Sequence, residues 1–125
     1  MLAGIVIGIA ALAATLLPMV ASSGSDRPRE IRLVVRNMTF FVEGETRPNP
    51  TLLVRAGEEV RLVLRNDEPG VRHDFAIQPW QVGTRMLEDR GEEDAITFRV
   101  PAERGEQTYL CNPHAQMMRG TIRVQ

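Results

Sequence analysis

The sequence predicts an all-β domain that folds as an antiparallel β-sandwich. From residue 30 onward, apolar and polar side chains alternate with a period of two in several short segments, as they do in half-buried strands. Glycine, proline and asparagine separate these segments, and none of them keeps the 3.6-residue period of a helix. About seven short strands with turns between them are typical of two packed sheets.

The clearest strands are expected at 31–36 and 60–65, where every second residue is Ile, Leu or Val. Residues 78–93 are expected to be irregular, with room for one helical turn at 85–89. Further strands or extended segments are expected at 38–42, 51–55, 71–77, 95–100, 107–111 and 120–124. Loops rich in Gly, Pro or Asn are expected at 43–50, 66–70 and 101–105.

Length and composition restrict the class of protein. A chain of 125 residues is expected to hold one folded domain, which we place at 30–125. A formal net charge of -1 argues against a nucleic-acid partner, because binding phosphates needs an excess of basic residues. A single cysteine excludes an internal disulfide, so this residue is a candidate metal ligand.

The N-terminal segment is apolar. Residues 2–21 carry no charge, and a helix of this length would span ~30 Å, the thickness of a bilayer core. Residues 1–21 are therefore interpreted as a membrane anchor or a cleaved secretory signal, and 22–29 as a flexible linker. We favour the anchor because the segment is long and has no basic start. Either interpretation places the domain outside the cytoplasm, at the periplasmic or extracellular face of a membrane.

The most informative stretch is 109–120, which reads Tyr-Leu-Cys-Asn-Pro-His-Ala-Gln-Met-Met-Arg-Gly. It contains the only cysteine, Cys111, together with His114 and the adjacent Met117 and Met118. A thiolate, two imidazoles and a weak axial thioether are the ligands of a copper electron-transfer site. This stretch supplies all of them except the second imidazole.

The second imidazole can come only from His73, because the chain has two histidines. The sequence therefore predicts one copper ion held by His73, Cys111, His114 and a methionine. A Cys–His nucleophilic pair is a weaker interpretation, since the methionines and the strand-rich scaffold would then have no role. Structural zinc would usually require a fourth strong ligand.

The loop resembles that of the cupredoxins, the blue-copper proteins. Cys111-Asn-Pro-His114 is similar to the plastocyanin and amicyanin pattern, and Met118-Arg-Gly-Thr121 is similar to the azurin and auracyanin pattern. Upstream, 56–66 and then His73 resemble the segment that carries the first histidine ligand. The resemblance implies a Greek-key sandwich with copper at one end that carries single electrons.

The resemblance also bears on the axial ligand. Met118 has the azurin-like distance from His114 and directly precedes Arg-Gly-Thr, so we favour it over Met117. The loop is of mixed type, because its two spacings match different members of the family. Asp74 stands where azurin and plastocyanin have asparagine, and either faces solvent or adds negative charge near the metal.

These observations lead to one functional prediction. The chain is expected to be a type 1 copper electron carrier and not an enzyme, with redox partner proteins that dock near His114 and no small-molecule substrate. Its N-terminal segment would associate it with a membrane. The alternative is a periplasmic protein that stores or delivers copper through the same residues.

Overall fold

The structure, a computed structural model, describes residues 27–125. The predicted anchor or signal segment at 1–21 and most of the predicted linker lie outside the described residues. The strands are β1 (Arg29–Arg36), β2 (Thr39–Val42), β3 (Leu52–Val54), β4 (Glu59–Asn66), β5 (Ala76–Ile77), β6 (Val82–Gly83), β7 (Glu93–Arg99), β8 (Gly105–Leu110) and β9 (Arg119–Val124), with short 3-10 turns η1 (Gln78–Trp80) and η2 (Asn112–His114). In this part of the chain no helix has the length and apolar character needed to cross a bilayer.

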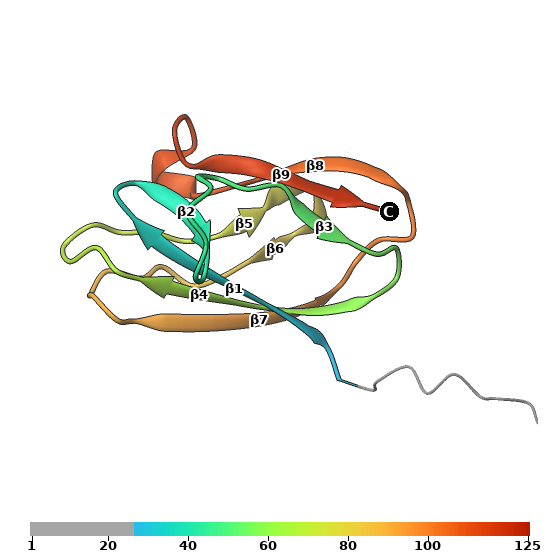
Figure 1. The fold of residues 1–125 in the computed structure, drawn as a ribbon, viewed down its shortest axis with the longest axis horizontal. Helices are drawn as coiled ribbons and strands as arrows, with labels where there is room; N and C mark the ends of the chain where they lie inside the picture. Colours follow the sequence, from blue (N-terminus) through green and yellow to red (C-terminus); the bar gives the residue numbers. More distant parts are fainter. Residues whose placement is uncertain (1–26) are drawn as a thin grey trace, which may run out of the picture.

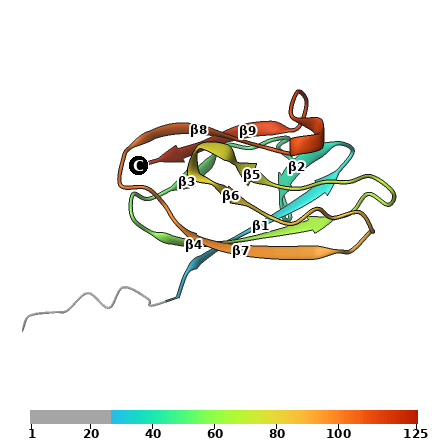
Figure 2. The same ribbon diagram turned by 180° about the vertical axis from the view of Figure 1, so that it is seen from behind.

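The strands form two sheets that face each other (Figure 1 and Figure 2). One sheet has the order β2-β1-β4-β7, and the other has the order β3-β9-β8-β5-β6. The predicted all-β class is therefore confirmed for the described residues. The turn η2 and the loop before β9 lie at one end of the sandwich, and the C-terminus lies at the other end (Figure 1).

The predicted antiparallel pairing is wrong for two pairs of strands. β1 runs parallel to β4, with Arg29 opposite Val60 and Val35 opposite Asn66. β3 runs parallel to β9. Neither pair is joined by a hairpin, because β2 and β3 separate β1 from β4, and five strands separate β3 from β9. Without a tight turn between the partners, their relative direction is not fixed by the local sequence.

The apolar side chains that alternate along the strands point inward and fill the space between the two sheets. Leu33 and Val35 of β1 face inward together with Leu62 and Leu64 of β4, and all four are buried. In the core, near the end of the sandwich that carries η2, three aromatic rings pack against one another. The ring of Phe40 meets those of Phe75 and Tyr109 edge-on at centroid distances of 6.1 Å and 5.5 Å, and Phe75 stacks on Tyr109 at 5.3 Å. This rigid cluster supports the end of the sandwich where the predicted copper ligands lie.

Two local predictions are corrected by the structure. The strand predicted at 71–77 is reduced to β5, because His73 forms only an isolated bridge with Leu87. The helical turn expected at 85–89 does not form, since Leu87 is buried and exchanges both main-chain hydrogen bonds with His73 (2.8 and 2.7 Å). The turn in this region is instead η1, which contains Pro79.

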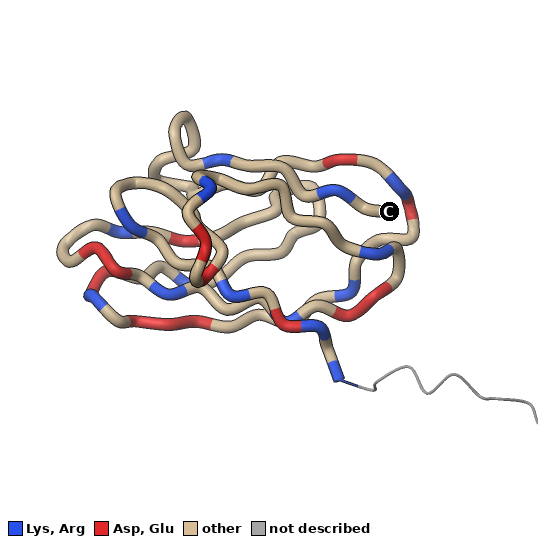
Figure 3. The backbone as a smooth tube through the Cα atoms, viewed as in Figure 1, with Lys and Arg blue, Asp and Glu red and all other residues tan. Residues whose placement is uncertain are grey.

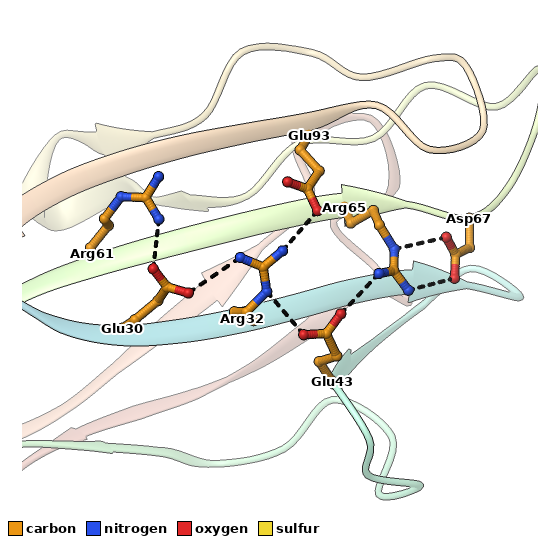
Figure 4. A network of polar contacts seen from close by, with 7 residues as sticks. All are labelled: Glu30, Arg32, Glu43, Arg61, Arg65, Asp67 and Glu93. Atoms are coloured by element: carbon orange, nitrogen blue, oxygen red, sulfur yellow. Dashed lines mark hydrogen bonds and ion pairs between the residues drawn. The ribbon is translucent and has the colours of Figure 1, made fainter.

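The outer face of the β2-β1-β4-β7 sheet carries a network of alternating charges (Figure 4). Arg32 contacts Glu43 and Glu93 at 2.9 and 2.8 Å, and Glu43 continues the network to Arg65 at 2.8 Å. The other members are Glu30, Arg61 and Asp67. Each pair is partly exposed, so each contributes little stability alone, but the charges neutralise one another across this face.

Candidate metal centre

The segment around Cys111 folds into a tight loop at the end of β8. The backbone N–H of Cys111 donates to the carbonyl of Met118 at 3.0 Å, which closes the loop at its base. Within the loop, the His114 N–H donates to the Cys111 carbonyl at 3.1 Å and the Met118 N–H donates to the His114 carbonyl at 2.9 Å. Pro113 lies inside η2, where its missing N–H is not needed. The loop therefore holds its side chains in fixed positions.

His73 comes from the segment between β4 and β5 and reaches the same place. Its Nδ1 lies 3.8 Å from the sulfur of Cys111, although the two residues are 38 positions apart. The Nδ1 of His114 lies 3.5 Å from the same sulfur. The candidate ligand atoms of these three residues all lie within 4.8 Å of one another. The structure thus brings together the three strong candidate ligands that the sequence singled out.

The two methionines of the loop have different surroundings. Met118 is fully buried next to Cys111 in the core, whereas 59% of Met117 is exposed. Of the two thioethers, only that of Met118 lies in the core together with Cys111 and His73. Burial therefore favours Met118, the residue that the sequence also favoured.

The protonation of the cluster suits a metal that binds thiolate and neutral imidazole. Burial raises the pKa of the Cys111 thiol, and a backbone hydrogen bond from Asp74 opposes this effect. Burial lowers the pKa of His73, and its hydrogen bond with Glu68 opposes that effect. The lowered pKa of His73 favours its neutral form, which has a lone pair to offer, while the thiol loses its proton when a metal binds.

Comparison with known proteins identifies the metal. A family profile described as copper binding proteins, plastocyanin/azurin family, matches residues 62–125, slightly more than half of the chain. The chain belongs to this family. It is a cupredoxin, and the cluster of His73, Cys111, His114 and Met118 within residues 27–125 fits one copper ion. A soft sulfur ligand with two imidazoles is the chemistry that copper selects.

Solved cupredoxin structures share the fold. The reduced auracyanin of Roseiflexus castenholzii superimposes with a TM-score of 0.62 at 17% identity, covering 77% of this chain and 96% of that one. Auracyanin A of Chloroflexus aurantiacus, a blue copper protein, gives 0.60 at 17% identity, covering 79% and 100%. Rusticyanin of Thiobacillus ferrooxidans gives 0.57 at 22%, covering 79% of each chain. No curated protein sequence matches this cupredoxin.

The structure also shows residues around the cluster that sequence reasoning did not place. Asp74 does not face solvent: it is 6% exposed, and its two carboxylate oxygens accept the backbone and side-chain N–H groups of Asn112, each at 2.7 Å. Its carboxylate thus ties the His73 segment to the ligand loop. Glu68 was missed altogether, although its Oε2 lies 2.7 Å from Nε2 of His73. Its position five residues before the histidine, in a loop, was the only available signal.

Asn66, expected to begin the loop at 66–70, is the last residue of β4. It is fully buried, and its side chain accepts the Glu68 N–H at 3.0 Å and donates to the Glu68 carbonyl at 2.8 Å. The same amide donates to the carbonyl of Asp89 at 3.2 Å. Asn66 therefore fixes the loop that leads from β4 to His73.

Proposed function

We propose that this cupredoxin is a mononuclear type 1 copper protein that carries single electrons between redox partners. The observation that carries the proposal is the convergence of two imidazoles, one thiolate ligand and a buried methionine from two segments distant in sequence. In this proposal His73, Cys111, His114 and Met118 are the ligands. When bound, copper supplies a one-electron couple.

The chain's own residues prepare the site for that couple. The hydrogen-bonded loop from Cys111 to Met118 and the bridge between His73 and Leu87 restrict how far the ligands can move. Restricted movement favours rapid transfer, because little rearrangement accompanies a change of charge. One electron enters from a reduced partner protein and one leaves to an oxidised partner, and no covalent bond of the chain forms or breaks.

His114 is the proposed point of electron entry and exit. It is half-buried, whereas His73 is fully buried. Around His114, the residues that line a shallow hollow carry no formal charge; they are Asn112, Pro113, Ala115, Gln116 and Met117. In Figure 3 the loop before β9 is drawn in tan, without a charged residue. An uncharged surface of this kind suits brief docking of redox partners over a small area.

We further propose that the domain works outside the cytoplasm, on the periplasmic or extracellular side. The support is the apolar segment at 2–21, which suits an anchor or a secretory signal. An anchor would keep the domain close to redox proteins of the membrane. The domain would carry electrons between proteins and would act on no small-molecule substrate.

Copper loading of the purified chain tests the proposal. We expect intense visible absorption and a reversible one-electron wave in voltammetry, with no absorption in Cys111→Ser, because the cysteine is the only source of thiolate. His73→Gly should lose the spectrum and regain part of it when imidazole is added. A copper-loaded protein that is colourless, or that yields its copper rapidly to a weak chelator, would support storage or delivery instead.

A further inference from the structure

His73 is fixed at both its main chain and its ring. The residue is fully buried, and its N–H and C=O both bond to Leu87. One ring nitrogen, Nδ1, faces the sulfur of Cys111, and the other, Nε2, lies 2.7 Å from the Oε2 atom of Glu68. A carboxylate oxygen can only accept a hydrogen bond. The proton of the neutral ring must therefore be on Nε2, which leaves the lone pair of Nδ1 free to bind a metal.

The carboxylate of Glu68 is itself held in place. Its second oxygen, Oε1, accepts the backbone N–H of Met38 at 2.9 Å, and its main chain is clamped by the side chain of Asn66 (3.0 and 2.8 Å). Asn66 is fully buried and also bonds to Asp89. The carboxylate of Glu68 is thus held by Met38 and its main chain by Asn66.

The contact with Met38 comes from the two-residue turn between β1 and β2. Asn37 and Met38, which connect β1 to β2, have φ angles of 50° and 55°. The left-handed region is uncommon for residues other than glycine and asparagine, so Met38 is strained there. In this conformation its N–H donates to Glu68. The strained turn thus supplies the second hydrogen bond that orients the carboxylate.

We propose that Glu68 is a positioning residue for the metal centre. It fixes His73 in the tautomer and orientation that present Nδ1 to the metal, and it places a negative charge behind this ligand. Ligating histidines commonly donate their other N–H to such a partner, which sets the ring orientation and raises the basicity of the ligand. The negative charge favours Cu(II) over Cu(I), so Glu68 lowers the reduction potential. This inference rests on the proposed electron carrier.

Glu68→Gln is the informative variant because both partners of the carboxylate are hydrogen-bond donors. Glutamine offers one acceptor oxygen and one NH2 group. If its oxygen accepts from Met38, its NH2 faces Nε2 of His73 and draws the ring proton to Nδ1. We expect copper affinity to fall by about 10- to 100-fold, the usual effect of losing such a partner. The loss should be larger for Cu(II), with a rise in potential of about 59 mV for each tenfold difference between the two oxidation states.

Asp67→Asn is the matched control. Asp67 is the adjacent residue, its substitution removes the same charge, and its carboxylate bonds to Arg65 and not to His73. In the full-length chain, copper affinity and potential should change clearly more in Glu68→Gln than in Asp67→Asn. Nitrogen NMR of the His73 ring in the metal-free and Cu(I) forms should show the proton on Nε2 in wild type and in Asp67→Asn, and loss of that state in Glu68→Gln.

Two results would overturn the proposal. One is an equal shift of potential in Glu68→Gln and Asp67→Asn. This result would mean that Glu68 acts only through its negative charge and not through its hydrogen bond to His73. The other is a proton on Nδ1 in the metal-free wild type, a measurement that needs no variant and so holds even if Glu68→Gln does not fold. Glu68→Asp keeps the charge, but the aspartate side chain is too short to reach both donors. Its copper affinity and reduction potential should therefore lie between those of wild type and of Glu68→Gln. If wild type itself gives no reversible couple, the proposed function fails, and the NMR result still decides the role of Glu68.

Discussion

The ring of Tyr109 lies directly over Gly120, its partner in the pairing of β8 with β9. A methyl group added at Gly120 would overlap the Cζ and hydroxyl atoms of that ring. The ring cannot move aside freely, because it is fully buried between Phe40 and Phe75 and its hydroxyl donates to the carbonyl of Pro50. The glycine that follows the ligand loop is therefore required by the packing of a tyrosine.

Gly120→Ala should lower the free energy of unfolding by about 1–3 kcal/mol, the usual cost of overpacking a core. Thermal unfolding of the metal-free protein measures this loss. The substitution should cost much less in a Tyr109→Leu background, where the ring is absent. An equal cost in both backgrounds would show that the ring of Tyr109 is not the cause.

Met118→Leu should raise the reduction potential without loss of copper. The weak axial sulfur stabilises Cu(II) more than Cu(I), so removing it favours the reduced state. Met117→Leu is the matched control in the same loop and should leave the potential nearly unchanged, since 59% of Met117 is exposed. Voltammetry of both copper-loaded variants decides the assignment. A large shift for Met117→Leu alone would make Met117 the axial ligand.

Asp74→Asn should loosen the ligand loop and raise the potential. The carboxylate accepts two N–H groups of Asn112, and an amide offers one acceptor and would turn its NH2 toward one of these donors. We expect faster hydrogen exchange at the Asn112 amide and easier reduction, because a negative charge near the metal is lost. Asp94→Asn is a suitable control, since Asp94 also accepts a backbone N–H, from Arg85 at 2.8 Å. Identical exchange at Asn112 in both variants would contradict the tie between Asp74 and the loop.

Cys111 of the metal-free protein should resist alkylation while the chain is folded. The thiol is fully buried, and burial raises its pKa above the ordinary value. A raised pKa means less thiolate at any given pH, so the reaction with iodoacetamide should remain slow even near pH 8.5, where about half of a free thiol is ionised. Addition of denaturant should restore the normal rate. Rapid labelling under native conditions would show that the loop opens when the metal is absent.

Scarcity explains why the candidate ligands could be predicted from the sequence. The chain has one cysteine and two histidines, so only His73 could join His114 at Cys111. Burial of Met118 then agrees with the spacing argument. Glu68 could not be singled out in the same way, because it is one of 16 acidic residues and its role depends on a turn 30 positions away.

The fold was predictable where the pattern is local. Alternation along β1 and β4 identified both strands, because each has one face toward the core. Their parallel pairing could not be predicted, since it depends on where the chain goes between them. The same limit applies at His73, where a bridge to Leu87 replaced the longer strand expected at 71–77.

The parallel register of β1 and β4 also gives the domain a direction. β1 begins at Arg29 and ends beside Asn66, the residue that anchors the loop to His73. Eight extended residues cover roughly 25 Å, so the chain enters the sandwich at the end far from the cluster (Figure 1). If the N-terminus is anchored in a membrane, as proposed above, the length of the sandwich separates the metal centre from the attachment point. Partners that dock at His114, as proposed, would then approach from the end opposite the attachment point.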